Sequence, residues 1–128
     1  MEPGIKILLI DDEFDFVETM NKRLSRRGYS CRIGLNCEEG LEILSAGWPD
    51  VVVLDVMLPD RDGIECLKEI KEKWPAIPVI LLTGHASMQA GLNSLQYGAS
   101  DYCLKPIDLE TLIEKIAIAC RENRPPQP

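Results

Sequence analysis

The chain has 128 residues, enough for one domain that buries roughly two-thirds of its unfolded surface. Hydrophobic residues make up 45% and charged residues 27%, as in an ordinary globular protein, and no apolar run approaches the roughly 20 residues that a membrane span needs. The net charge of −7 argues against a nucleic-acid surface, which requires clustered Lys and Arg, and suits a site for a cation or a basic partner.

Five apolar runs alternate with segments of helical periodicity. The strands are expected at residues 5–10, 29–33, 50–55, 78–82 and 101–104, and the helices at about 14–27, 38–45, 64–74, 88–97 and 109–120. Within the fourth helix, Gly91 lowers the helical propensity. The alternation predicts a three-layer α/β/α domain with a parallel sheet covered by helices on both faces. Right-handed crossovers place the ends of successive strands at one edge of that sheet.

The third run, Asp-Val-Val-Val-Leu-Asp at 50–55, has the pattern of a strand buried on both faces. Asp55 stands where this strand leaves the sheet, and ligands of open parallel α/β sheets bind at the carboxyl ends of the strands. A single Asp at such a place is more often a turn residue or a helix cap. The neighbouring strands decide between these interpretations.

Polar side chains follow four of the five runs: Asp11 and Asp12 after the first, Asp55 after the third, Thr83 after the fourth and Lys105 after the fifth. Taken singly, each has an ordinary explanation as a cap, a turn hydroxyl or a surface charge. Because the ends of parallel strands share one edge, the five side chains are expected to converge. The sequence therefore predicts one polar site.

Three carboxylates in one cleft call for a cation, because two of them about 5 Å apart repel by roughly 3 kcal/mol at an effective dielectric of about 20. Oxygen ligands without His or Cys suit Mg²⁺, which also bridges to phosphate oxygens. A carboxylate held there can act as a nucleophile and form an acyl phosphate. Thr83 could then hydrogen-bond one phosphoryl oxygen and Lys105 could neutralise another.

Four segments resemble the receiver domain of two-component response regulators. They are Asp-Asp-Glu after the first strand, Val-Leu-Asp55-Val-Met-Leu-Pro-Asp-x-Asp-Gly63, Leu-Thr83-Gly and Asp-Tyr102-Cys-Leu-Lys105-Pro106. The resemblance covers residues 5 to about 122 and implies a flavodoxin-like (CheY-like) fold with strand order 2-1-3-4-5 and five helices. We expect a receiver domain over residues 1–122, followed at 123–128 by a Pro-rich tail that begins a linker to an output domain absent from this chain.

The resemblance implies a role for each acidic residue of the site. Asp55 would be the phospho-acceptor. It would hold Mg²⁺ together with Asp12, the backbone carbonyl of Met57 and, through water, Asp11. Glu13 is interpreted as a charge at a helix N-terminus and not as a metal ligand.

The resemblance also implies a switch. Thr83 and Tyr102 would form the switch pair, in which the hydroxyl moves toward the phosphoryl group while the ring turns inward. Thr83 and Lys105 would assist phosphoryl transfer to Asp55, and a cis peptide would join Lys105 to Pro106.

The function implied is phosphorelay signal transduction. A sensor histidine kinase or a histidine phosphotransfer protein would pass a phosphoryl group from phospho-histidine to Asp55. The chain would be a signalling phospho-acceptor that catalyses only its own phosphorylation and dephosphorylation. The face formed by the fourth helix, fifth strand and fifth helix would contact an output domain or a second receiver. Neither nucleic acid nor a membrane is an expected partner of this chain.

Two residues flank the position from which water would attack the phosphoryl group. Met57 is apolar and should orient water poorly, so we hypothesise a long-lived phosphoryl group. His85 is interpreted as an exposed loop histidine.

Three other functions fit part of the pattern. A phosphatase of the haloacid-dehalogenase type needs a second Asp two residues after its nucleophile, where Met57 stands here, and carries the nucleophile on its first strand. A flavin or nucleotide module needs a phosphate-cradling loop after the first strand, where Asp11 and Asp12 would repel a phosphate. A receiver that acts as an unphosphorylated interaction domain stays open.

The five cysteines, Cys31, Cys37, Cys66, Cys103 and Cys120, are odd in number and lack C-x-x-C spacing. This pattern supports neither a disulfide framework nor a zinc site. We therefore expect reduced thiols, several of them small core residues, in a cytoplasmic protein.

Overall fold

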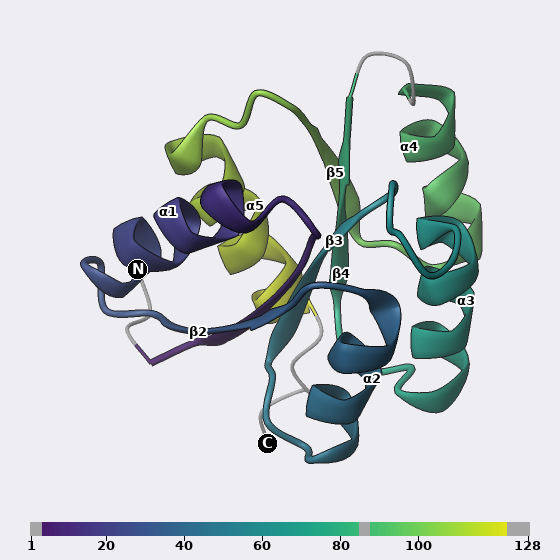
Figure 1. Cartoon of the computed structure of the whole chain (residues 1–128), viewed down its shortest axis with the longest axis horizontal. Coiled ribbons are helices and arrows are strands. Elements are labelled where there is room, and N and C mark those ends of the chain that lie inside the picture. The colour runs from purple at the N-terminus through teal and green to yellow at the C-terminus, as the bar shows by residue number, and fades with distance from the viewer. Residues whose placement is uncertain (1–3, 85–87, 123–128) are drawn as a thin grey trace.

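The computed structural model describes residues 4–84 and 88–122, which form a three-layer α/β/α domain (Figure 1). Five parallel strands make one sheet in the order β2-β1-β3-β4-β5, so the predicted fold is confirmed. The strands are β1 (Lys6–Ile10), β2 (Ser30–Gly34), β3 (Val51–Asp55), β4 (Val79–Thr83) and β5 (Asp101–Leu104). The helices are α1 (Phe14–Ser25), α2 (Cys37–Ser45), α3 (Gly63–Lys73), α4 (Met88–Ser94) and α5 (Leu109–Glu122), with a 3₁₀ turn, η2 (Leu95–Tyr97), after α4.

Helices α1 and α5 cover one face of the sheet, and α2, α3 and α4 cover the other (Figure 1). Successive strand residues enter opposite core layers: Val51 and Val53 pack with α1 and α5, whereas Val52 and Leu54 pack with α2 and α3. Every residue of β3 and β4 is buried. This is the pattern predicted for strands that helices cover on both sides. The packing on both faces holds the ends of these strands in place.

The helix boundaries differ from the predicted ones by a few residues. The first helix ends at Ser25, and Gly28, with φ +91, turns the chain toward β2. The predicted fourth helix is divided into α4 and η2. Its last turn tightens where the Ser94 hydroxyl donates to the carbonyl of Gly91 at 2.6 Å, a local bond that competes with regular α-helix hydrogen bonding.

The last helix begins as predicted, because the Asp108 carboxylate accepts a hydrogen bond from the backbone N–H of Thr111 at 3.2 Å. The predicted Pro-rich tail at 123–128 and His85 lie outside the described residues. Among the helices that the structure describes, none is long and apolar enough to cross a membrane.

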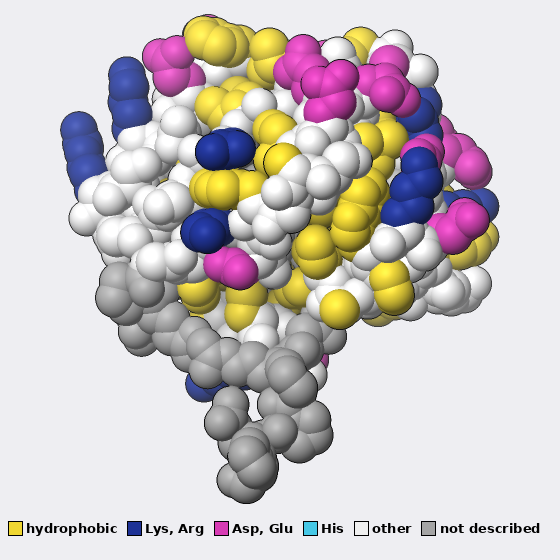
Figure 2. Space-filling view, turned by 90° about the horizontal axis from the view of Figure 1, so that it is seen from below, with side chains coloured by type: hydrophobic (Ala, Val, Ile, Leu, Met, Phe, Trp, Pro, Cys, Tyr) yellow, Lys and Arg dark blue, Asp and Glu magenta, His cyan; other side chains and the backbone are white. Residues whose placement is uncertain are grey.

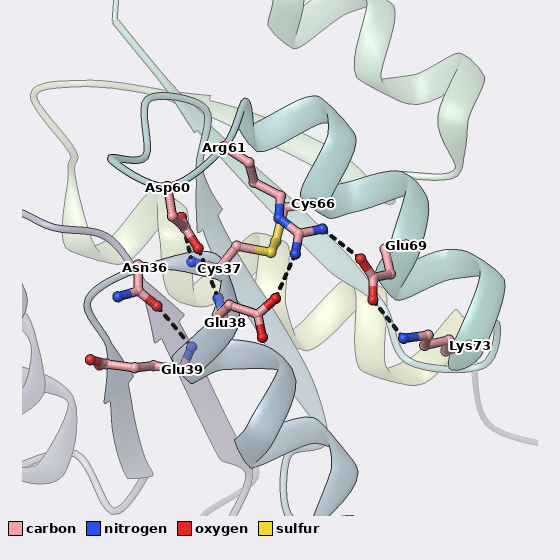
Figure 3. A network of polar contacts seen from close by, with 9 residues as sticks. All are labelled: Asn36, Cys37, Glu38, Glu39, Asp60, Arg61, Cys66, Glu69 and Lys73. Carbon is pink, nitrogen blue, oxygen red and sulfur yellow. Dashed lines mark hydrogen bonds and ion pairs between the residues drawn. A yellow bond between two sulfur atoms is a disulfide. The ribbon is translucent and has the colours of Figure 1, made fainter.

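The prediction of five reduced cysteines is wrong for two of them. Cys37 and Cys66 form a disulfide between α2 and α3, with a Cα–Cα distance of 6.1 Å (Figure 3). The two residues are 29 positions apart, so no short spacing motif marks the pair. The β3 crossover brings their helices together, and sequence spacing alone does not show that proximity.

The molecular surface carries charges of both signs. Figure 2 views the molecule from below relative to Figure 1, where basic side chains lie apart from one another and acidic side chains gather mainly along one rim. Hydrophobic side chains are visible between them.

Candidate functional site

The carboxyl ends of β1, β3, β4 and β5 lie at one edge of the sheet. In the sheet, Ile10 of β1 pairs with Leu54 of β3, and Asp55 of β3 pairs with Leu82 of β4. Thr83 of β4 pairs with Leu104 of β5. The polar residues that follow these strands are therefore neighbours in space. The convergence expected from the sequence is present in the structure.

Three carboxylates form an acidic cluster at this edge. Asp11, Asp12 and Asp55 each offer an oxygen, and these oxygens lie within 4.8 Å of one another. Asp11 and Asp55 are buried, with 1% and 4% exposure, whereas Asp12 is exposed. An all-oxygen set suits Mg²⁺, which accepts one or two carboxylates and keeps several waters.

Both oxygens of Asp11 are already engaged by the protein. One accepts the backbone N–H of Glu13 and the other accepts Lys105 Nζ, each at 2.9 Å. With both oxygens engaged, Asp11 suits a contact with the metal through water, whereas Asp12 and Asp55 could contact the metal directly. The residues present therefore fit the predicted Mg²⁺.

Lys105 joins the carboxylates from two strand ends. Its Nζ lies 2.9 Å from Asp11, 2.6 Å from Glu13 and 3.5 Å from Asp55. Burial opposes the charged ammonium, but the hydrogen bonds to Glu13 and Asp11 and the negative charges of Asp11 and Asp55 outweigh it and raise the pKa of Lys105. Lys105 therefore stays positive beside Asp55.

The carboxyl group of Asp55 is held in an environment that disfavours its charge. Burial and then the negative charge of Asp11 raise the pKa of Asp55 to about 6, although Lys105 and the N–H of Met57 act in the opposite direction. The N–H of Met57 donates to Asp55 Oδ1 at 3.4 Å. A bound cation would relieve the repulsion between the carboxylates.

Thr83 is fully buried, and its Oγ1 has no hydrogen-bond partner among the described residues. A buried hydroxyl without a partner is costly and commonly marks a functional position. Gly91 of α4 packs beside it: a Cβ built on Gly91 would lie 3.1 Å from Thr83 Cγ2 and 3.1 Å from Tyr102 Cδ2. Gly91 is a site residue that the sequence interpretation missed, although a glycine inside a helix was the available signal.

The remaining site residues surround this centre. The Met57 side chain is 69% exposed, and the Lys105–Pro106 peptide bond is cis. Glu13 precedes the first residue of α1, as its interpretation as a helix N-terminal charge requires, and it also pairs with Lys105. That pairing joins residues 92 positions apart and depends on the tertiary fold.

Comparison with known proteins shows the family. The sequence model of the response regulator receiver domain matches residues 7–117. The uncharacterized transcriptional regulatory protein YkoG of Bacillus subtilis is 38% identical over 123 residues, which cover 96% of this chain and 54% of YkoG. The DNA-binding transcriptional regulator NtrC of Proteus hauseri is 35% identical over 129 residues, which cover 98% of this chain and 27% of NtrC.

Solved structures give the same result. A response regulator receiver domain protein from Clostridium thermocellum has a TM-score of 0.87 and 32% identity, covering 92% of this chain and 95% of that one. The receiver domain of NtrX from Brucella abortus has a TM-score of 0.85 and 30% identity, covering 90% of this chain and 98% of that one. The chain spans from about a quarter to about half of the curated relatives it matches. The chain belongs to the response regulator receiver domain family.

Proposed function

We propose that Asp55 accepts a phosphoryl group from a phospho-histidine on a sensor histidine kinase or a histidine phosphotransfer protein. One observation carries the proposal: the buried carboxylate of Asp55 lies among three carboxylates whose oxygens are within 4.8 Å of one another, and 3.5 Å from the ammonium of Lys105. The unpaired hydroxyl of Thr83 lies at the same sheet edge and supplies a donor that a phosphoryl oxygen could use.

The transfer makes one bond and breaks one. A carboxylate oxygen of Asp55 attacks phosphorus, and the bond from phosphorus to the imidazole nitrogen breaks with its electron pair left on the ring. Lys105 balances the charge of the phosphoryl group, and Thr83 donates a hydrogen bond to it. Held by Asp12, Asp55 and the Met57 carbonyl, with Asp11 contributing through water, Mg²⁺ would supply charge compensation.

The acyl phosphate would then bias a switch. The phosphoryl group would carry roughly −1.5 to −2 charges where the ionised carboxylate of Asp55 carried −1, and its oxygens would draw the Thr83 hydroxyl toward them. Tyr102 packs against the same core layer as α2 and α3, and its ring adjoins Gly91. Movement of Thr83 and Tyr102 would remodel the face made by α4, β5 and α5, where an output domain or a second receiver would dock.

A groove suits the phosphodonor protein. It lies between α1 and the segment after β5 and is lined by Phe16, Met20, Arg23 and Pro106 among others. Phe14, the first residue of α1, does not line this groove, but it is 54% exposed and follows Glu13, which does line it. The Phe14→Ala variant should take phosphoryl groups more slowly from a phospho-histidine protein, whereas its reaction with a small-molecule phosphodonor should be unchanged.

The decisive experiment is intact mass spectrometry after incubation with a small-molecule phosphodonor and Mg²⁺. Wild type should gain one phosphoryl group, and Asp55→Asn should gain none. Asp50→Asn is the matched control, because Asp50 stands next to the other end of β3 and should leave the reaction intact. Wild type that gains no phosphoryl group would contradict the proposal.

Curated relatives of this chain are transcriptional regulators of greater length. We propose that any output on DNA belongs to a further domain beyond the receiver, as the predicted linker at 123–128 suggests. A cytoplasmic site of action fits a phosphoryl donor of the histidine kinase class.

A further inference from the structure

Helix α2, the loop between β3 and α3, and α3 meet at one cluster of side chains (Figure 3). The disulfide joins Cys37, the first residue of α2, to Cys66 in the first turn of α3. Both cysteines are fully buried, with 0% exposure. The bond therefore fixes the starts of two helices relative to each other.

Polar contacts join the same three elements without the disulfide. The Asp60 carboxylate accepts the backbone N–H groups of Cys37 and Glu38 at 3.0 and 3.1 Å, which completes the N-terminus of α2. The Arg61 guanidinium pairs with Glu38 on α2 and with Glu69 on α3 (Figure 3). The geometry that places the two sulfur atoms together therefore has support besides the sulfur–sulfur bond.

This cluster is connected mechanically to Asp55. Gly63, the first residue of α3, donates its N–H to the carbonyl of Val56 at 2.9 Å. A Cβ built on Gly63 would lie 2.5 Å from the carbonyl oxygen of Asp55, so the start of α3 rests directly on the end of β3. Fixing α3 at Cys66 thus restrains the loop of residues 56–62 that borders Asp55.

We propose that Cys37 and Cys66 are a reversible redox pair whose disulfide clamps the loop of residues 56–62 beside Asp55. The proposal does not require Asp55 to be phosphorylated. The reaction partner is a low-molecular-weight disulfide of the glutathione class. Reduction would loosen the loop, while the contacts of Asp60 and Arg61 keep the two thiols close enough to rejoin.

The exchange balances in two steps. One cysteine, as thiolate, attacks a sulfur of the small disulfide, forming a mixed disulfide and releasing one small thiol. The second cysteine, as thiolate, then attacks the cysteine sulfur of the mixed disulfide and displaces the second small thiol. The pair loses two electrons and two protons, and the small disulfide gains them. Because both sulfurs are buried, access requires opening of the first turn of α2, where Cys37 stands at a helix end that can fray.

The first test counts thiols in the folded full chain. Wild type is equilibrated with oxidised or with reduced glutathione in native buffer and then unfolded and alkylated for mass spectrometry. In the oxidised sample we expect three alkylated cysteines and a linked Cys37–Cys66 peptide, because Cys31, Cys103 and Cys120 remain thiols. In the reduced sample we expect all five cysteines to be alkylated. Five in both samples, three in both samples, or glutathione attached to the pair would overturn the proposal.

The second test reads the clamp itself. Amide hydrogen exchange at residues 56–62 should be slower in the oxidised chain, and its Tm should be higher by on the order of 10 °C. Cys31→Ser should keep both differences, because Cys31 lies on β2 outside the cluster. Cys66→Ala and Cys37→Ser should lose them. Exchange rates at 56–62 that are equal in oxidised and reduced wild type would overturn the clamp even if the bond forms.

Discussion

Lys105 contacts acidic groups from two strand ends, so a single ammonium group sets much of the site's geometry. It hydrogen-bonds Asp11 and Glu13, which follow β1, and lies 3.5 Å from Asp55 at the end of β3. The same contacts keep it charged. Its removal would leave buried carboxylates without a counter-charge, which costs more than the pairing itself contributes.

We expect Met57 to influence how water approaches a phosphoryl group on Asp55. Its side chain is exposed and apolar and offers a water molecule only the weak acceptor of its thioether sulfur. We predict that Met57→Asn raises the rate of dephosphorylation at least several-fold, because the amide can orient the attacking water. Loss of the phosphoryl group is followed by intact mass after removal of the phosphodonor. Met57→Leu is the apolar control, and equal rates in all three proteins would contradict the prediction.

Gly91 leaves space that Thr83 and Tyr102 share. Alanine at this position would place a methyl group 3.1 Å from atoms of both side chains, which must then shift by a few tenths of an ångström. We predict that Gly91→Ala weakens the change that phosphorylation causes in the NMR signals of Thr83 and Tyr102. Its stability should stay within about 1 kcal/mol of wild type, because the better helix propensity of Ala offsets the tighter packing. Asn93→Ala, exposed on the same helix, is the control, and an undiminished response in Gly91→Ala would count against a role in the switch.

At the scale of elements, α2 depends on a residue that is far away in the sequence. Asn36 caps the helix locally by accepting the N–H of Glu39 at 2.8 Å. Asp60, in the loop after β3, accepts two further N–H groups of α2. The N-terminus of α2 is thus completed by two segments together. The stability of α2 therefore depends on the position of the loop that borders Asp55.

Asp60→Ala should therefore destabilise the domain by about 1–2 kcal/mol, since two backbone N–H groups lose a charged acceptor. Urea unfolding measures the difference. Glu42→Ala, exposed on α2, is the matched control and should change stability by less than about 0.5 kcal/mol. A loss that is no larger for Asp60→Ala than for Glu42→Ala would show that water replaces the carboxylate at no cost.

At the scale of the whole molecule, the burial of Asp55 beside another carboxylate lowers folding stability at pH values where Asp55 is ionised. Burial and the charge of Asp11 raise the pKa of Asp55 to about 6 from an ordinary value of 3.8. Between these pH values, the folded chain keeps a proton that the unfolded chain releases. The contribution of Asp55 to stability therefore falls as pH rises through this window and stays low above it.

In a chelator-containing buffer, we predict that wild type loses up to about 3 kcal/mol of stability relative to Asp55→Asn between about pH 4 and about pH 6. Added Mg²⁺ should recover stability at pH 7 in wild type and do so much less in Asp55→Asn, because a ligand that binds only the folded state stabilises it. Thermal unfolding across pH measures both effects. Parallel pH profiles for the two proteins would contradict the prediction.

Much of this molecule could be predicted from its sequence because local patterns and parallel topology act together. The convergence of Asp55 with the polar residues after the other strands could be predicted from the rule that the ends of parallel strands share an edge. The contacts of Glu13 with Lys105, of Gly91 with Thr83 and of Asp60 with α2 could not be predicted in this way. They depend on how loops and helices pack across the sheet, and periodicity does not encode that packing.

The sequence by itself determined the alternation of strands and helices, the helical cover on both faces of the sheet and the edge at which the polar site forms, since hydrophobic period and the handedness of crossovers decide these features. The strand order followed from the resemblance to receiver domains and was confirmed by the structure. Only the tertiary structure decided which side chains touch. It brought Cys37 to Cys66, although their spacing suggested two separate thiols. It also left the Thr83 hydroxyl buried without a partner in the described part of the chain. Both outcomes depend on side chains from distant segments meeting in a dense core, which no local stretch of sequence contains.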